Sequence, residues 1–194
     1  MTMRFEQILA EGVAQTSYLV GDDAAGVAAV VDPRPDVEEY VERARELGLS
    51  ITHVFETHIH ADFMSGAREL VARLDGSARL HVSTEGGAEY GFDHQPVREG
   101  DEFVFGGVRM RAKFTPGHTP EHVSYLLFES GRDEPWGVLT GDSFFVEAFE
   151  RRGQQPLEVQ TGDRLERRQI VETAVIDDVD DRSTAVEATQ ERGE

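Results

Sequence analysis

The sequence predicts a single α/β domain, and three features of its 194 residues favour this class. Short apolar runs typical of strands recur from the N-terminus to residue 140. Two segments between them show the apolar spacing of amphipathic helices. One apolar run leads directly into a polar loop and then a helix, the order found at ligand-binding edges of α/β sheets. We therefore expect one α/β domain over residues 1–146.

Strands and a helix are expected in the first 50 residues. Apolar runs at residues 17–20 and 27–31 flank a turn-forming Gly-Asp-Asp segment, which predicts two strands of one sheet. A helix should then begin with Asp36 as its N-cap, because Glu39 three residues later completes a common start signal. Apolar residues recur along one face until Gly48, which is expected to end this helix.

The middle of the chain contains the strand, loop and helix noted above. Residues 51–56 form an apolar run that ends in the polar stretch THIHAD, and residues 67–74 have helical apolar spacing. A further strand is expected at residues 78–82, followed by a loop-rich stretch over residues 83–100.

A β-hairpin is expected around Gly106 and Gly107, which separate two apolar runs by two turn residues. In the second arm, apolar residues alternate with Arg109, Arg111 and Lys113. This alternation puts the three cations on one face, which we interpret as solvated rather than as an anion site. More strands are expected at residues 123–128 and 136–140.

The composition excludes several classes of protein. Acidic residues outnumber basic residues by 38 to 19, and the net charge of -19 opposes binding to nucleic acid or an anionic membrane. All basic residues except Lys113 are arginine, which with the acid excess suggests a halophilic source, with GC-rich codon usage as the alternative. The chain has no apolar run of about 18 residues and no secretory signal, so we expect a soluble, cytoplasmic protein.

The C-terminal part of the sequence differs from the rest. Residues 177–194 contain seven acids and two arginines, and aromatic residues nearly vanish after residue 146. Residues 147–194 are therefore expected to be a divergent acidic segment that is partly disordered.

Cysteine is absent, so any metal ligands must be histidine or carboxylate side chains. His58, His60 and Asp62 are spaced by two after a predicted strand, so on an extended segment they project to one side. His118 lies in a Pro/Gly turn, and Asp142 follows another predicted strand. Because a sheet can bring such loops together at one edge, the pattern predicts a metal site.

The other four histidines are less informative. His53 is expected in or near the core with a satisfied hydrogen bond. His122 is expected either to orient the site or to serve only its own strand. His81 and His94 are expected on the surface or in loops.

Three segments of the chain resemble the metallo-β-lactamase fold superfamily, within it the glyoxalase-II-like branch that includes the persulfide dioxygenases (sulfur dioxygenases). They are ITHVFETHIHADFMSGARELVARL at residues 51–74, FTPGHTPEHVSYLLFE at residues 114–129 and VLTGDSFFV at residues 138–146. The resemblance covers residues 3–146 and implies an αββα sandwich whose second half is incomplete here.

The resemblance also implies a metal and its ligands. It implies that His58, His118 and Asp142 bind one Fe(II), with zinc as the alternative metal. His60 and Asp62 would stand beside the metal as catalytic groups or extra ligands that orient water. Two histidines and one carboxylate form the set used by non-haem Fe(II) oxygenases.

The chain departs from the two-metal hydrolases of this superfamily. Phe63 stands where they have a histidine in the motif HxHxDH, and no histidine follows His122. A second metal would be left with Asp62 and a shared Asp142, and two oxygen ligands are too few for a firm zinc site. We therefore expect one metal per chain.

A second departure follows GDSFFV. Dioxygenase-like proteins continue with a Gly-Arg-Pro-Asp segment and further strands and helices, whereas this chain reads EAFERRGQQPLEV. The missing elements would cover apolar sheet surface, so association into a homo-oligomer is expected.

Three functions follow from these observations. The first is an iron-dependent persulfide dioxygenase that oxidises a small-molecule thiol persulfide to sulfite and thiol; without cysteine, the chain cannot carry the persulfide itself. The second is a metal-dependent thioester hydrolase of glyoxalase II type, with Asp62 as the base. The third is a truncated, non-catalytic remnant that binds a metal or a partner.

Overall fold

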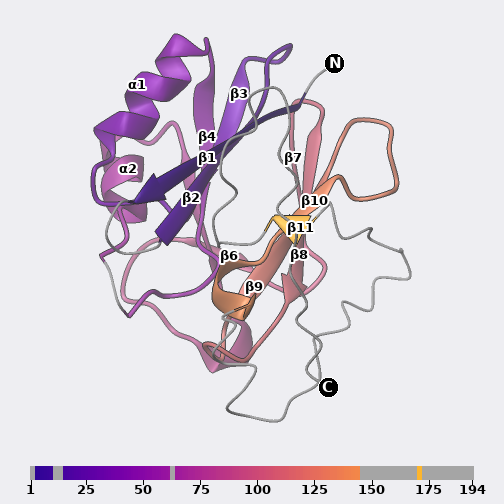
Figure 1. Cartoon of the computed structure of the whole chain (residues 1–194). Helices are drawn as coiled ribbons and strands as arrows, with labels where there is room; N and C mark the ends of the chain where they lie inside the picture. Colours follow the sequence, from indigo (N-terminus) through magenta and orange to yellow (C-terminus); the bar gives the residue numbers. More distant parts are fainter. Residues whose placement is uncertain (1–2, 11–14, 62–63, 145–169, 172–194) are drawn as a thin grey trace, which may run out of the picture.

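The computed structural model describes residues 3–10, 15–61, 64–144 and 170–171, which form two β-sheets with helices on one side (Figure 1). The first sheet has the spatial order β1-β2-β3-β4-β5-β6. Its strands are β1 (Met3–Ala10), β2 (Gln15–Asp22), β3 (Val27–Val31), β4 (Ser50–Phe55), β5 (Arg79–Ser83) and β6 (Gln95–Val97). β1 to β3 pair antiparallel, whereas β3 to β6 pair parallel. The carboxyl ends of β3, β4 and β5 therefore meet at one edge.

The second sheet has the order β11-β10-β9-β8-β7. Its strands are β7 (Glu102–Phe105), β8 (Val108–Phe114), β9 (Val123–Phe128), β10 (Gly137–Leu139) and β11 (Ile170–Val171). Neighbours pair antiparallel except β10 and β11, which are parallel. The predicted hairpin is confirmed, because Phe105 pairs with Val108 across Gly106 and Gly107. Gly106 has a φ of 61°, a left-handed conformation that glycine adopts without steric cost.

Two helices, α1 (Glu38–Glu46) and α2 (Ala67–Arg73), cover the outer face of the first sheet (Figure 1). Both were predicted from apolar spacing, and their buried residues include Tyr40 and Leu70. Gly48 ends α1 as expected. Its N–H donates to the carbonyl of Arg45, and the N–H of Leu49 donates to the carbonyl of Ala44, which together form a Schellman motif. The short 3-10 helices are η1 (Glu85–Gly87) and η2 (Gly141–Phe144).

The predicted N-cap of α1 is wrong. The N-cap position is Val37 rather than Asp36, and no side chain caps the helix there. The N–H of Val37 already donates to the carbonyl of Pro35 at 3.0 Å, so the chain turns before Asp36 can act as a cap. The hydroxyl of Tyr40 accepts the N–H of Arg34 at 2.9 Å and holds this turn from inside.

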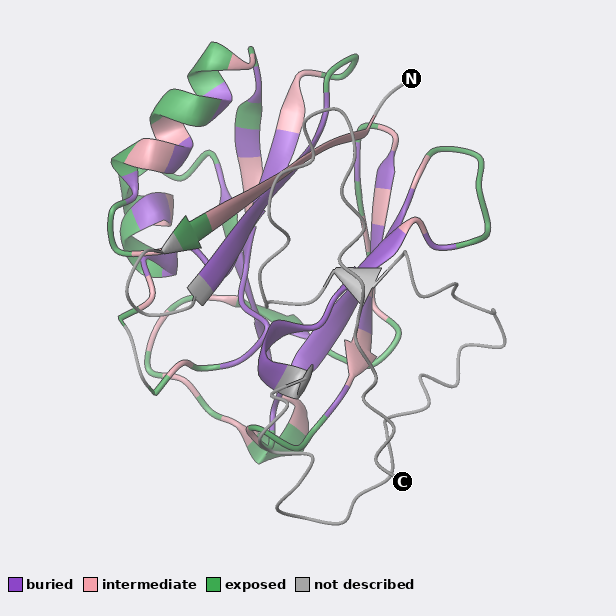
Figure 2. Cartoon of the chain, in the orientation of Figure 1, coloured by how far each residue is buried: buried purple, intermediate pink, exposed green. Residues whose placement is uncertain are grey.

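The two sheets face each other, and buried residues run along strands of both (Figure 2). His81 belongs to this inter-sheet core, so its expected surface or loop position is wrong. It lies on β5, is 5% exposed and stacks on Phe55 with ring centroids 4.4 Å apart. Its neighbours Leu80 and Val82 point to the helices, and the alternation of the strand therefore turns His81 inward.

The outer face of the second sheet carries Leu126, Phe128 and Val138, each at most 3% exposed. The guanidinium carbons of Arg109 and Arg111 lie 4.0 and 5.0 Å from the ring centroid of Phe128. The expectation of an open apolar surface is therefore wrong for these three residues. The cations share one face, as the alternation predicted, and Arg109 and Arg111 both pair with Glu102.

The predicted α/β arrangement of two facing sheets is confirmed, with helices on the outer face of the first sheet. Within residues 3–10, 15–61 and 64–144, no helix covers the second sheet. The predicted disorder of residues 147–194 falls outside the described residues, apart from β11, which pairs with β10. None of the described helices is both long and apolar enough to cross a membrane.

Candidate metal centre

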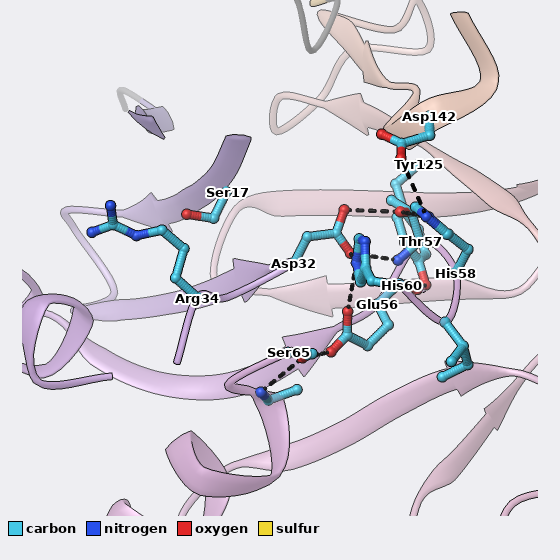
Figure 3. Close-up of polar contacts among 12 residues, drawn as sticks. Ser17, Asp32, Arg34, Glu56, Thr57, His58, His60, Ser65, Tyr125 and Asp142 are labelled. Carbon is cyan, nitrogen blue, oxygen red and sulfur yellow. Dashed lines mark hydrogen bonds and ion pairs between the residues drawn. The ribbon is translucent and has the colours of Figure 1, made fainter. Parts of the chain in front are cut away.

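Three loops at one end of the sheets carry the predicted metal ligands. His58 follows β4, His118 lies between β8 and β9, and Asp142 follows β10. Nε2 of His58 lies 3.4 Å from Oδ2 of Asp142, and Nε2 of His118 lies 3.5 Å from the same oxygen. Figure 3 shows His58 reaching toward Asp142. The structure therefore brings these three residues together.

The cluster is closed on one side and open on the other. The side chains of His58 and Asp142 are 0% and 5% exposed, whereas that of His118 is 36% exposed. A small molecule could therefore approach past His118 while the other two donors stay buried.

Asp32, directly after β3, fixes the orientation of His58 through Thr57. The N–H and hydroxyl of Thr57 donate to the Asp32 carboxylate at 2.7 and 2.8 Å. Burial alone would raise the pKa of Asp32, but His60 and the Thr57 N–H lower it, so this carboxyl is an acceptor. The Thr57 oxygen must then accept from Nδ1 of His58, 2.9 Å away. Nε2 of His58 therefore keeps its lone pair.

Donor atoms of His58, His60 and Asp142 lie within 4.8 Å of one another, which is close enough to hold a metal ion, and His118 joins this group through its 3.5 Å contact with Asp142. Nε2 of His58 is buried and has no hydrogen-bond partner among the described residues, although it faces Asp142. A buried polar atom without a partner is costly, and a cation would satisfy it. Two donors that each bind one ion at about 2.1 Å lie about 3 to 3.5 Å apart, which agrees with the spacing between the histidine nitrogens and Asp142.

His60 points toward two buried carboxylates (Figure 3). Its Nε2 lies 3.2 Å from Oε2 of Glu56 and 3.4 Å from Oδ1 of Asp32. Burial lowers the pKa of His60, but hydrogen bonds and charge from the two carboxylates outweigh burial and raise it to about 10. Burial raises the pKa of Glu56 to about 7. A donor atom of His60 still lies within 4.8 Å of donors on His58 and Asp142.

Glu121 and His122 brace the loops. Oε1 of Glu121 accepts the N–H of Ile59 at 3.0 Å, which ties the loop after β4 to the loop before β9. His122 is fully buried beside the Thr115 hydroxyl, 2.9 Å from its Nδ1, and burial lowers its pKa to about 3. A Cβ on Gly141 would lie 2.8 Å from Nε2 of His122, so this ring packs beneath the segment that carries Asp142.

Two residues of the predicted site, Asp62 and Phe63, lie outside the described residues. His53 is half-buried, and its Nδ1 lies 2.8 Å from the Thr52 hydroxyl, as expected. His94 lies in a loop, also as expected. The sequence did not single out Asp32, Glu56 and Thr57, although all three follow the carboxyl ends of parallel strands, where ligand sites form.

Residues 10–182 match the sequence profile described as "Metallo-beta-lactamase superfamily". The chain belongs to this superfamily. Among curated relatives of this metallo-beta-lactamase domain is a hydroxyacylglutathione hydrolase of Acaryochloris marina, 33% identical over 66% of this chain and 49% of the relative. Another hydroxyacylglutathione hydrolase, from Synechococcus sp. (strain JA-2-3B'a(2-13)), is 30% identical over 80% of this chain and 59% of the relative.

Solved structures agree with this membership. A metallo-beta-lactamase from Staphylococcus aureus subsp. aureus COL superposes with a TM-score of 0.69 at 38% identity, covering 74% of this chain and 44% of that protein. ETHE1 from Myxococcus xanthus superposes with a TM-score of 0.59 at 35% identity, covering 64% of this chain and 54% of that protein. The metallo-beta-lactamase domain thus spans about half the length of the relatives it matches.

Proposed function

We propose that this chain binds one divalent metal through His58, His118 and Asp142 and hydrolyses a thioester of a small thiol. The observation that carries the proposal is the convergence of these donors from three loops, with His58 Nε2 facing Asp142 without a hydrogen bond and His118 partly exposed to solvent. The relatives named hydroxyacylglutathione hydrolase support the thioester as the substrate class.

Different residues would have different roles at such a metal site. A bound divalent metal would supply a water of lowered pKa and a Lewis acid for the thioester carbonyl. His58 and Asp142 form the buried wall, and the hydrogen bonds from His58 through Thr57 to Asp32 would keep the Nε2 lone pair of His58 available to a bound metal. We assign Asp62 as the base that takes the proton from the attacking water. His60 lies beside the site and contacts the buried carboxylates of Glu56 and Asp32.

A second candidate is the iron-dependent persulfide dioxygenase. The ligand set of two histidines and one carboxylate favours it, and so does Phe63, which removes a nitrogen donor for a second metal. In this reaction a thiol persulfide, O2 and water would give sulfite and the thiol. The metal, iron or zinc, distinguishes the two candidates.

The test is purification of the full chain without oxygen, in low and in molar salt, followed by loading with iron or zinc alone. Thioester loss would be followed with a hydroxyacylglutathione, and O2 uptake with glutathione persulfide. Thioester hydrolysis that disappears in His118→Ala, but persists in the loop variant His94→Ala, is the expected result. His118 is partly exposed, so its removal should leave the fold intact.

Other outcomes identify the alternatives. O2 uptake with persulfide and no thioester loss would favour the dioxygenase. Metal binding without turnover of either substrate would favour a non-catalytic metal-binding remnant. Two tightly bound metals per chain would contradict the single site.

A further inference from the structure

His60 lies within reach of two competing sets of donor atoms. One set is His58 with Asp142, and the other is Asp32 with Glu56; in each set the donors, including one from His60, lie within 4.8 Å of one another. The ring centroids of His58 and His60 are only 4.1 Å apart. In the structure Nε2 of His60 is engaged by the carboxylates, at 3.2 Å and 3.4 Å. The position of the His60 ring therefore decides whether a metal would be coordinated by two histidines or by three.

Glu56 is itself held in place from the start of α2. The Ser65 hydroxyl donates to Oε1 of Glu56, and the Ser65 oxygen accepts the N–H of Ala67 at 3.0 Å. The other carboxylate oxygen, Oε2, is buried, has no hydrogen bond among the described residues and lies at ion-pair distance, 3.2 Å, from Nε2 of His60. A buried carboxylate is costly without a positively charged or hydrogen-bonding partner, so Glu56 and His60 stabilise each other.

Asp32 has a different task in this cluster. Both of its oxygens accept from Thr57, at 2.7 Å and 2.8 Å, and its contact with His60 is longer than either. Oε2 of Glu56, by contrast, makes no hydrogen bond among the described residues, and its 3.2 Å contact with His60 is an ion pair shorter than that of Asp32. Removing Glu56 would therefore take away the shorter of the two contacts that hold the His60 ring, and would leave the link from Asp32 through Thr57 to His58 in place.

On the basis of the proposed metal site, we propose that Glu56 holds the His60 imidazole out of the coordination sphere. The metal is then coordinated by two histidines and one carboxylate of this chain. Glu56 is the positioning residue that sets the number of histidine ligands. Three nitrogen donors with one carboxylate favour a closed, zinc-like site, whereas two nitrogens and one carboxylate leave positions open. Glu56 thereby tunes both the choice of metal and the room left for substrate.

The test uses the full chain loaded with zinc alone. X-ray absorption counts imidazole ligands, competition with a chelator gives the zinc affinity, and circular dichroism confirms folding. We expect two imidazoles in the wild type and in His60→Ala. We expect three in Glu56→Leu, with zinc affinity raised about 10-fold, the scale on which groups that contact ligands alter metal affinity. Glu56→Leu combined with His60→Ala should return both values to those of the wild type.

Glu56→Gln keeps the side-chain shape and one oxygen acceptor but removes the negative charge, so it should raise zinc affinity by less than Glu56→Leu does. This variant provides the test if Glu56→Leu does not fold. Three imidazoles in the wild type, or the loss of one in His60→Ala, would overturn the inference. Unchanged affinity and ligand number in the folded Glu56 variants would overturn it as well. A wild type that binds no zinc would instead refute the proposed metal site, and this inference with it.

Discussion

The Thr57 hydroxyl lies between Asp32 and His58, at 2.8 Å and 2.9 Å. Because its proton goes to Asp32, His58 must donate from Nδ1 and present Nε2 to the metal. Thr57→Val keeps the side-chain shape and removes this link. We expect zinc affinity to fall by about 10-fold to 100-fold, measured by chelator competition. Thr57→Ser restores the hydroxyl and should bind like the wild type; equal affinities in the two variants would show that the link is unimportant.

Gly141 controls the position of Asp142. It has a φ of 51°, and a Cβ there would lie 2.5 Å from the Thr57 hydroxyl oxygen. Gly141→Ala should displace this segment, weaken metal binding and lower the free energy of unfolding by about 1 to 3 kcal/mol, measured by denaturant titration. The matched control is Gly87→Ala, where φ is 80° but no atom lies within 4 Å of the added Cβ. Similar losses of metal affinity in both variants would refute the steric argument.

At the residue scale, the sequence singled out the candidate donors but not the residues that support them. His58, His118 and Asp142 could be found because each follows a strand or turn signal that is local in the chain. The partnership of Thr57 with Asp32 spans 25 positions, and the two residues meet only because β3 and β4 pair in parallel. The local pattern contains no trace of this pairing.

His81 makes β5 sensitive to acid. It stacks on Phe55 and His53 between the sheets, and neither ring nitrogen has a hydrogen-bond partner among the described residues. Burial, with the nearby charges of His53 and Arg79, lowers its pKa from 6.5 to about 3. The unfolded chain therefore takes up the proton first. The stabilising effect of neutral His81 is complete above pH 6.5 and is lost as the pH falls toward 3.

We expect His81→Leu to be near wild type in stability at neutral pH, because it replaces an unpaired ring with an apolar side chain. At about pH 4 the variant should be more stable than the wild type by on the order of 2 to 3 kcal/mol. Denaturant titration at both pH values measures this difference, and His94→Ala, in a loop, is the control. An equal loss of stability in wild type and His81→Leu on acidification would contradict this account.

At the element scale, features with local causes were predicted and features with distant causes were not. The Gly106–Gly107 hairpin and the end of α1 at Gly48 follow from backbone preferences of glycine. The start of α1 was misplaced because the Tyr40 hydroxyl, from within the helix, holds the preceding turn. His81 was misassigned because its burial depends on Phe103, on a strand of the other sheet.

Over the whole molecule, we expect the acid excess to limit stability. On the outer face of the second sheet, Leu126, Phe128 and Val138 are buried, and Val104 is exposed at 64%. The net charge of -19 remains after all 19 cations are counted, and many of these cations form exposed ion pairs such as Arg73 with Glu38. Such exposed pairs contribute little, so repulsion among the acidic side chains outweighs their attraction at low salt.

Salt should therefore raise the melting temperature. Between about 0.1 and 3 M sodium chloride the Debye length falls from about 10 Å to below 3 Å, which screens the acid excess while costing only the weak surface pairs. Most of the screening should be complete by about 1 M, and a further rise would come from stronger apolar burial. Thermal melts across this range, with light scattering at each step to exclude a change in association, measure the effect. A melting temperature that stays level or falls would mean that repulsion among the acidic residues does not limit the stability of this chain.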